Sequence, residues 1–184
     1  MNRPKSLFIG SLTVDDIPEV NRIFATAITG AFDREGLGHL HEEIRQEVRH
    51  KQELAAASLQ PGGSDTEFLV ARVHGRAAGT VSFGPCGEEI RICTAHELDG
   101  IGELGSLYVQ PELQGQGIGS ALIEAMLSAL AARGIASFCL DSGYRSAQQR
   151  WCRKFGQPYK VVEDYWGPGS PHMVWLCQVK EHLK

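Results

Sequence analysis

The sequence predicts a single α/β domain over residues 1–184, and three observations support this fold class. A buried strand, a glycine-rich loop, a long apolar helix and a short apolar strand follow one another between residues 104 and 140, which is the order of a parallel βαβ unit. Two apolar runs on either side of His74-Gly75 are typical of an antiparallel hairpin. A chain of 184 residues that is 42% hydrophobic can also bury one full core.

The N-terminal part of the chain is predicted to contain one strand, over residues 7–12, and two helices. The first helix begins at a capping box of Asp16 and Glu19, and its apolar residues recur at helical spacing to about residue 31. The second helix, over about residues 40–58, has only a thin apolar stripe. Most of its charged residues are therefore expected to face solvent.

The middle of the chain is predicted to form the hairpin and then the long apolar helix. The hairpin strands cover residues 67–73 and 77–83, and residues 88–92 are a candidate extension of the sheet. The long helix is apolar nearly all round, with a narrow polar stripe of Ser120, Glu124 and Ser128. So narrow a stripe predicts that this helix packs against a sheet.

The last part of the chain is predicted to complete the sheet. A helix is expected between a capping box of Ser146 and Gln149 and a terminal Gly156. The remaining strands are predicted over residues 136–140, 159–162 and 173–179. The loop over residues 163–172 is rich in aromatic residues, glycine and proline, and two interpretations stay open: a substrate-specificity loop or a plain hairpin connector.

Composition and charge narrow the class of protein. The net charge of -4 and the interspersed signs argue against a nucleic-acid-binding protein. No apolar run approaches the length of a membrane span, and the first residues do not resemble a signal peptide, so we expect no membrane partner and a cytoplasmic location. The five cysteines lack C-x-x-C spacing, which argues against a disulfide framework and a zinc site, and no metal is expected.

The glycine-rich loop, Gln114-Gly115-Gln116-Gly117-Ile118-Gly119, is the main functional signal. Its glycines let the backbone approach a ligand, and the free N–H groups of the following helix favour an anion, so the segment predicts a phosphate cradle. A Walker loop is excluded because no lysine lies between residues 51 and 154. A dinucleotide fingerprint fits less well, since Ser120 stands where its third glycine belongs, although Asp141 lies about where a ribose-binding acid would. A glycine-rich surface turn is the remaining alternative.

The loop resembles the Q/R-x-x-G-x-G/A motif of the GCN5-related N-acetyltransferases (the GNAT family), at Gln114, Gly117 and Gly119. The preceding Leu-Tyr-Val-x-Pro and the following Ile-Gly-Ser-Ala are similar to that family as well. The resemblance implies a mixed twisted sheet with helices on both faces, and acetyl-CoA bound in a gap between the strands that end at Val109 and Leu140. The implied cofactor-binding residues are Leu107, Tyr108, Val109, Gln114, Gly115, Gln116, Gly117, Ile118, Gly119 and Ser120.

Acyl transfer to an amine requires a group that removes a proton, because an alkylamine with a pKa of about 10.4 is mostly protonated at pH 7. Glu103 is the candidate base, since it begins the cofactor strand and alternation places it on the face of Val109. A solvent-facing glutamate is the alternative interpretation. The resemblance further implies an oxyanion donor near Val109 and an acceptor site lined by the first two helices, with Asp33, Glu35, His39 and His41 as candidates.

One position departs from the family pattern. Cys152 stands where the family usually carries a tyrosine that protonates the coenzyme A thiolate, and the candidate replacements are Cys152 itself, Tyr144, Tyr159, Tyr165 or a water molecule. The sequence therefore predicts an acyl-CoA-dependent N-acyltransferase, most simply transferring acetyl to an amine of a small molecule or peptide and releasing coenzyme A. The alternative is a non-catalytic acyl-CoA sensor or partner-binding module on the same fold. A homodimer is compatible with either function.

Overall fold

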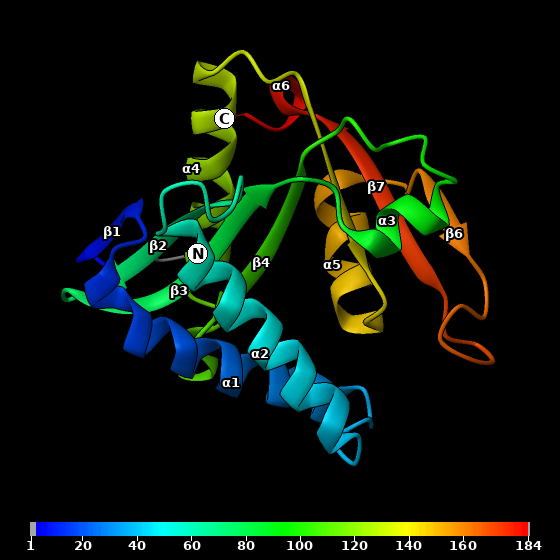
Figure 1. Cartoon of the computed structure of the whole chain (residues 1–184), viewed down its shortest axis with the longest axis horizontal. Coiled ribbons are helices and arrows are strands. Elements are labelled where there is room, and N and C mark those ends of the chain that lie inside the picture. The colour runs from blue at the N-terminus through cyan, green and yellow to red at the C-terminus, as the bar shows by residue number, and fades with distance from the viewer. Residues whose placement is uncertain (1–2, 184) are drawn as a thin grey trace. The chain divides into compact units, whose positions relative to one another are not determined.

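The computed structural model describes residues 3–183 and contains a seven-stranded mixed sheet of order β1-β2-β3-β4-β5-β7-β6 (Figure 1). The predicted α/β class is thereby confirmed. The chain forms two compact units, one from the residues up to 83 with 106–126, the other from 84–105 with the residues from 127 onward. Strand β4 (Glu103–Val109) and helix α4 (Ile118–Ala132) each contribute to both units.

In the first unit, β1 (Leu7–Ser11), β2 (Glu67–Val73) and β3 (Arg76–Gly84) pair antiparallel. The turn between β2 and β3 lies at His74 and Gly75, whose φ angles are 52° and 79°. Positive φ at both central residues is the geometry of a two-residue hairpin turn. The hairpin predicted from the sequence is therefore confirmed.

The two long helices of the first unit are α1 (Ile17–Arg34) and α2 (His41–Ser58). The positions of both helices agree with the prediction, but the capping box predicted from Asp16 and Glu19 does not form. Thr13 and Asp16 form the box, before a short 3-10 turn, η1 (Val14–Asp16). The Glu19 carboxylate instead accepts the backbone N–H of Ala77 at 2.7 Å, which joins the start of α1 to β3.

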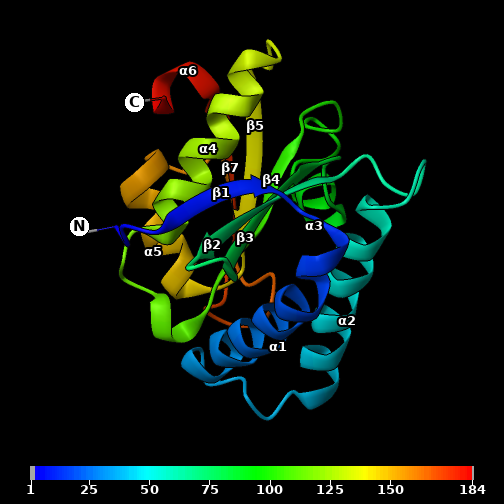
Figure 2. The same ribbon diagram turned by 90° about the vertical axis from the view of Figure 1, so that its left-hand side faces the viewer.

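Both faces of the first unit's sheet are covered, as Figure 2 shows for α1 and α2 on one side and α4 on the other. The Phe24 ring on α1 lies 5.6 Å from the ring of Tyr108 on β4. Val109, the next residue of β4, faces α4 on the other side of the sheet. A Cβ placed on Gly119 of α4 would lie 3.8 Å from Val109 Cγ2. Coverage of both faces explains why residues 77–83 of β3 are buried without alternation.

In the second unit, β7 (His172–Gln178) pairs antiparallel with both β5 (Ser137–Ser142) and β6 (Lys160–Val162). Glu103 at the start of β4 pairs parallel with Cys139 of β5. The unit's helices are α3 (Glu88–Cys93), α5 (Arg145–Phe155) and the short α6 (Val179–His182). Ile90 of α3 packs on the sheet face that carries Cys139, and Phe155 of α5 packs on Phe138 of the other face, at 5.6 Å between rings.

Two local predictions in this unit are wrong. Residues 88–92 are not a strand, because they begin helix α3. The predicted box of Ser146 and Gln149 does not cap α5, which begins at Arg145 with Tyr144 at its N-cap and no side-chain cap.

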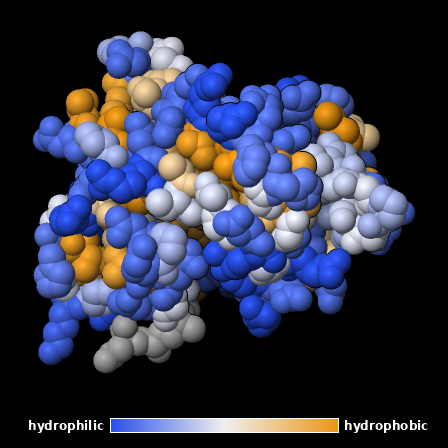
Figure 3. All heavy atoms as spheres, turned by 90° about the horizontal axis from the view of Figure 1, so that it is seen from below, coloured by the Kyte–Doolittle hydropathy of each residue, from blue (hydrophilic) through white to orange (hydrophobic). Residues whose placement is uncertain are grey.

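The face of the molecule seen in Figure 3 is mostly hydrophilic, with hydrophobic residues in small separate patches. Such scattered exposure is normal for a folded domain. None of the helices in residues 3–183 combines the length and the hydrophobicity that crossing a bilayer requires.

Candidate functional site

The glycine-rich loop joins the end of β4 to the start of α4 through a short 3-10 turn, η2 (Pro111–Leu113). Gly115 and Gly117 both have a φ angle of 78°, a left-handed backbone conformation that residues other than glycine rarely adopt. The Gln114 side chain donates to the backbone oxygen of Val109 at 3.1 Å. The Gln114 side chain thus holds the loop at the end of β4, and the two glycines allow its left-handed turns.

The first turn of α4 has backbone donors without acceptors. The first bond at the start of the helix runs from the Ala121 N–H to the Gly117 oxygen at 3.0 Å. Within residues 3–183, the N–H groups of residues 117–120 have no hydrogen-bond acceptor. The first turn also lacks an acidic residue that would neutralise the positive end of the helix dipole. This arrangement is suited to a bound anion such as a diphosphate.

Close packing around the loop depends on small residues. A Cβ at Gly79 of β3 would lie 2.8 Å from the Tyr108 backbone oxygen and 3.2 Å from the Leu122 side chain of α4. The glycine therefore lets the start of α4 approach β3 and β4. Tyr108, in turn, donates its hydroxyl to Glu47 Oε1 of α2 at 3.3 Å.

All the predicted cofactor-binding residues lie in the first unit, on the end of β4, in the loop or in the first turn of α4. The candidate acceptor residues at the α1–α2 connection belong to the same unit: Asp33 lies in α1 and His41 begins α2. Among residues 3–183, no three or more histidine, cysteine or carboxylate side chains are grouped as a metal site requires.

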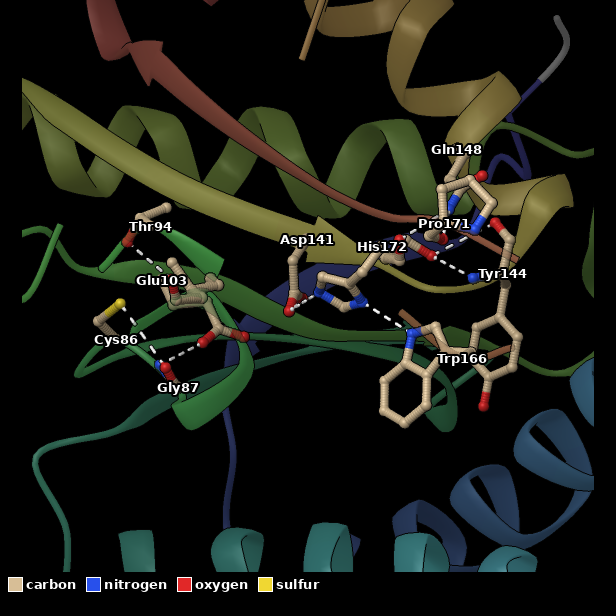
Figure 4. Close-up of polar contacts among 12 residues, drawn as sticks. Cys86, Gly87, Thr94, Glu103, Asp141, Tyr144, Gln148, Trp166, Pro171 and His172 are labelled. Carbon is tan, nitrogen blue, oxygen red and sulfur yellow. Dashed lines mark hydrogen bonds and ion pairs between the residues drawn. The ribbon is translucent and has the colours of Figure 1, made fainter. Parts of the chain in front are cut away.

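Glu103, the candidate base, lies in the second unit. Its Oε2 accepts the backbone N–H of Gly87, the N-cap of α3, at 2.8 Å (Figure 4). Farther along β4, Ser106 has φ of 46°, and its backbone oxygen accepts the buried Thr80 hydroxyl at 2.8 Å. A left-handed residue interrupts the pleat of a strand. The alternation that placed Glu103 on the face of Val109 therefore does not continue across Ser106.

A second polar group lies at the end of β5, where Asp141, His172 and Trp166 form a chain of hydrogen bonds (Figure 4). Trp166 Nε1 donates to His172 Nδ1 at 3.0 Å, and His172 Nε2 lies 2.9 Å from Asp141 Oδ2. An indole nitrogen can only donate, so Nδ1 of the imidazole accepts and carries no proton. His172 is therefore neutral, with its proton on Nε2 directed at Asp141.

Neighbouring residues hold the hydrogen-bonded group of Asp141, His172 and Trp166 in place. Gln148 of α5 donates to the backbone oxygens of Ser142 at 2.9 Å and Pro171 at 2.8 Å, which ties the end of β5 to the start of β7. A Cβ at Gly143 would lie 2.4 Å from Trp166 Nε1, so only glycine leaves room for the indole. Sequence reasoning did not find His172 or Trp166 as site residues. The aromatic, glycine- and proline-rich composition of residues 163–172 was the signal that pointed to this loop.

The candidate replacements for the missing tyrosine differ in their surroundings. Cys152 is exposed on α5. Tyr159 donates its hydroxyl to Glu97 Oε2 at 2.6 Å, and this bond raises the pKa of the phenol. Burial raises the pKa of Tyr165. A raised pKa keeps both phenols protonated at neutral pH.

Comparisons with known proteins agree with this architecture. Residues 64–156, about half of the chain and including the glycine-rich loop, match the family model described as an acetyltransferase (GNAT) domain. No curated protein sequence matches the chain significantly.

Solved structures give the same fold. A Desulfovibrio desulfuricans protein assigned to the GNAT family is 19% identical, with a TM-score of 0.69 over 94% of this chain and 99% of that one. The PaiA N-acetyltransferase of Thermoplasma acidophilum, solved with coenzyme A, is 16% identical, with a TM-score of 0.67 over 94% and 99%. The ribosomal-protein-S18-alanine N-acetyltransferase of Escherichia coli is 16% identical, with a TM-score of 0.62 over 94% of each chain. With the family model matched over its central half, this chain belongs to the GNAT family of acetyltransferases.

Proposed function

We propose that this chain is an acyl-CoA-dependent N-acyltransferase that transfers acetyl from acetyl-CoA directly to an amine of a small molecule or a protein. The observation that carries the proposal is the set of N–H groups without acceptors at residues 117–120, behind the left-handed Gly115 and Gly117. The fold supports it, because the similar Thermoplasma acidophilum enzyme was solved with coenzyme A.

In this proposal, acetyl-CoA supplies an activated acyl thioester, and the chain supplies binding and proton transfer. The loop and first helical turn, from Gln114 to Ser120, hold the diphosphate through backbone N–H groups. Gly79 lets the start of α4 pack closely on β3 and β4 beside the end of the strand. A backbone N–H near Val109 is the proposed donor to the oxyanion, a contact of about 3 kcal/mol in related chemistry.

Glu103 is the proposed general base. A protonated amine must lose a proton before it attacks, and a carboxylate can take that proton directly or through a water molecule. The bond from the Gly87 N–H orients Glu103 Oε2. A carboxylate has about four lone-pair positions, so this bond is compatible with the role. The departing thiolate is a moderately good leaving group without a dedicated acid, which is consistent with Cys152 at the position of the usual tyrosine.

Gly117→Glu tests the cradle. The variant adds bulk and negative charge where the diphosphate would bind, and we expect acetyl-CoA binding to be lost in isothermal titration calorimetry. Gly134→Glu is the matched control, because Gly134 has a similar φ of 72° but follows the opposite end of α4. Wild-type affinity in the Gly117→Glu protein would show that the cradle is wrongly assigned.

A thiol-release assay separates the enzyme from the non-catalytic alternative. The wild-type protein is incubated with acetyl-CoA and a panel of alkylamines, peptides and aminoglycosides. Release of coenzyme A that depends on an amine supports the transferase. Tight binding of acetyl-CoA without release for any acceptor would favour a sensor.

A further inference from the structure

We propose that Cys86 and Cys139 form a redox-sensitive dithiol, which closes to a disulfide by exchange with a low-molecular-weight disulfide. Closure takes the Gly87 N–H away from Glu103 and so removes the bond that orients the proposed base. The dithiol itself stands on the geometry of the second unit alone, whereas its effect on catalysis rests on the proposed function.

The two thiols lie together although they come from distant parts of the chain. Cys86 precedes α3, and Cys139 lies in the middle of β5. Cys139 is fully buried in a core cluster with Ile90 of α3, and Cys86 packs against this cluster. The two side chains share a hydrogen bond. Two thiols in contact on separate segments are the arrangement from which a disulfide can form.

Cys86 is the thiol that reacts first. It is partly exposed, whereas Cys139 is buried. The hydrogen bond with Cys139 favours the Cys86 thiolate, because a donor stabilises the charged form of its partner. Cys139 is held on its other side, where its Sγ lies 3.5 Å from the Gly102 oxygen and its N–H donates to the same oxygen at 2.9 Å. Cys86 is therefore the attacking cysteine and Cys139 the resolving one.

The exchange balances with one small disulfide, RSSR. The Cys86 thiolate attacks one sulfur of RSSR, a new S–S bond forms, and one RS⁻ leaves and takes up the proton that Cys86 lost. Cys139 then loses its proton and attacks Cys86 Sγ, and the second RS⁻ leaves and takes up that proton. The two cysteines are oxidised, and RSSR is reduced to two molecules of RSH.

The surroundings of the pair favour the closed state but slow its formation. Burial raises the pKa of both thiols, and the carboxylates of Glu103 and Asp141 add to this effect. A dithiol is a strong oxidant when its reduced form is stabilised, and a raised pKa means that the thiolates of this pair are not. Since exchange needs a thiolate, closure is slow at neutral pH. The pair therefore responds to a lasting change in the balance of thiols and disulfides.

Closure acts on Glu103 through the residue that follows Cys86. Cys139 is fixed in the sheet, because β5 pairs with β4 on one side and with β7 on the other. A disulfide bond is about 2.05 Å long, much shorter than a contact between two thiols, so the segment that carries Cys86 has to move. Gly87, the next residue, donates to Glu103 Oε2 at 2.8 Å (Figure 4), and its N–H moves with Cys86. Glu103 thereby loses its orienting bond.

The first experiment tests the disulfide in the full chain. The reduced protein is incubated with glutathione disulfide, remaining thiols are blocked with N-ethylmaleimide under denaturing conditions, and its peptides are analysed by mass spectrometry without reduction. We expect a linked pair of peptides that carry Cys86 and Cys139, which dithiothreitol separates. Cys86→Ser should abolish the link.

Two other cysteines serve as controls for this experiment. Cys93→Ser is the matched variant, since Cys93 is buried in the same cluster, and it should keep the link. The exposed Cys152 shows by its mixed disulfide that the oxidant has reacted. A link that involves Cys93, or modified Cys152 with Cys86 and Cys139 unlinked, overturns the proposal.

The second experiment measures acetyl transfer before and after oxidation, with an amine that the thiol-release assay identifies and mass spectrometry of the product. For the oxidised wild type we expect kcat to fall about 10- to 100-fold, because catalysis depends this strongly on the position of a general base. Dithiothreitol should restore kcat, and the Kd of acetyl-CoA should not change, since the cradle belongs to the first unit. Oxidised and reduced Cys86→Ser should not differ. An unchanged kcat in protein that carries the disulfide overturns the effect on Glu103.

A third measurement does not depend on turnover. Hydrogen exchange at the Gly87 amide, followed by NMR, reports the bond to Glu103. We expect this amide to lose its protection when the wild type is oxidised and to keep it in Cys86→Ser. Retained protection in the presence of the disulfide overturns the proposed movement. Reduced protein that transfers acetyl to no amine overturns the proposed function and the effect on catalysis, while the peptide link and the Gly87 amide still decide the dithiol.

Discussion

The start of α4 offers a substitution whose effects on stability and on cofactor binding have opposite signs. Ser120 is exposed in a first turn that has no acidic residue and whose N–H groups lack acceptors. Ser120→Asp places a negative charge beside the positive end of the helix dipole, which stabilises a protein by about 0.3–1 kcal/mol. For a chain of this size, we expect Tm to rise by about 1–3 °C in scanning calorimetry.

The same charge repels a diphosphate bound at this position. Two unit charges roughly 5 Å apart interact by about 1–3 kcal/mol when the effective dielectric constant lies between about 80 and 20. The Kd of acetyl-CoA in titration calorimetry should therefore rise about 5- to 150-fold, and less at high salt because ions screen the repulsion. Ser120→Asn is the matched control, with a similar shape and no charge. A Ser120→Asp protein that is stabilised but binds acetyl-CoA with wild-type affinity would refute the placement of the diphosphate.

Three further predictions concern packing, pH and thiol reactivity. Gly79→Ala should lower the free energy of unfolding by about 1–3 kcal/mol in urea denaturation, because the added Cβ would lie 2.8 Å from a backbone oxygen of β4. An unchanged urea midpoint would contradict that close approach. Burial raises the pKa of Asp16, but the hydrogen bonds from Arg72 and the capping residue outweigh it and hold the pKa below 3.8. A lowered folded-state pKa contributes stability above the unfolded value and loses it as the pH falls through the folded value. Asp16→Asn should therefore cost about 1–3 kcal/mol at pH 7 and progressively less as the pH falls below the usual aspartate pKa. A cost independent of pH would exclude this ion pair as the source. Iodoacetamide should modify the exposed Cys152 of the native protein. It should not modify Cys177, because burial raises the pKa of that thiol to about 12. Rapid labelling of Cys177, detected by mass spectrometry, would contradict its burial.

The elements with strong local signals were predictable from the sequence. The His74-Gly75 turn fixed the hairpin, because positive φ at both positions is a local requirement. The loop and the long helix are contiguous in the chain, so the positive φ values of Gly115 and Gly117 and the free donors of α4 followed from the glycine spacing alone. The family resemblance then supplied the sheet in which these elements lie.

Short or long-range features were not predictable in the same way. Helix α3 has six residues, too few to establish a helical period, and its isoleucines also suit a strand. The chain from Asp141 through His172 to Trp166 joins the end of β5 to a loop and a strand about thirty residues later, and only tertiary pairing brings them together. The regular alternation assumed for β4 failed at Ser106, because a single left-handed residue has no signature in the sequence.

The left-handed residue in β4 also bears on how the family could vary its chemistry. Ser106 is locked by the Thr80 hydroxyl, so the irregularity is a fixed part of the strand rather than a local distortion. If an evolving homologue moved this kink along the strand, the side chains between its old and new positions would exchange faces while the ladder on either side kept its partners. Relatives could thus recruit an acid from a different position of the same strand without rebuilding the fold around it.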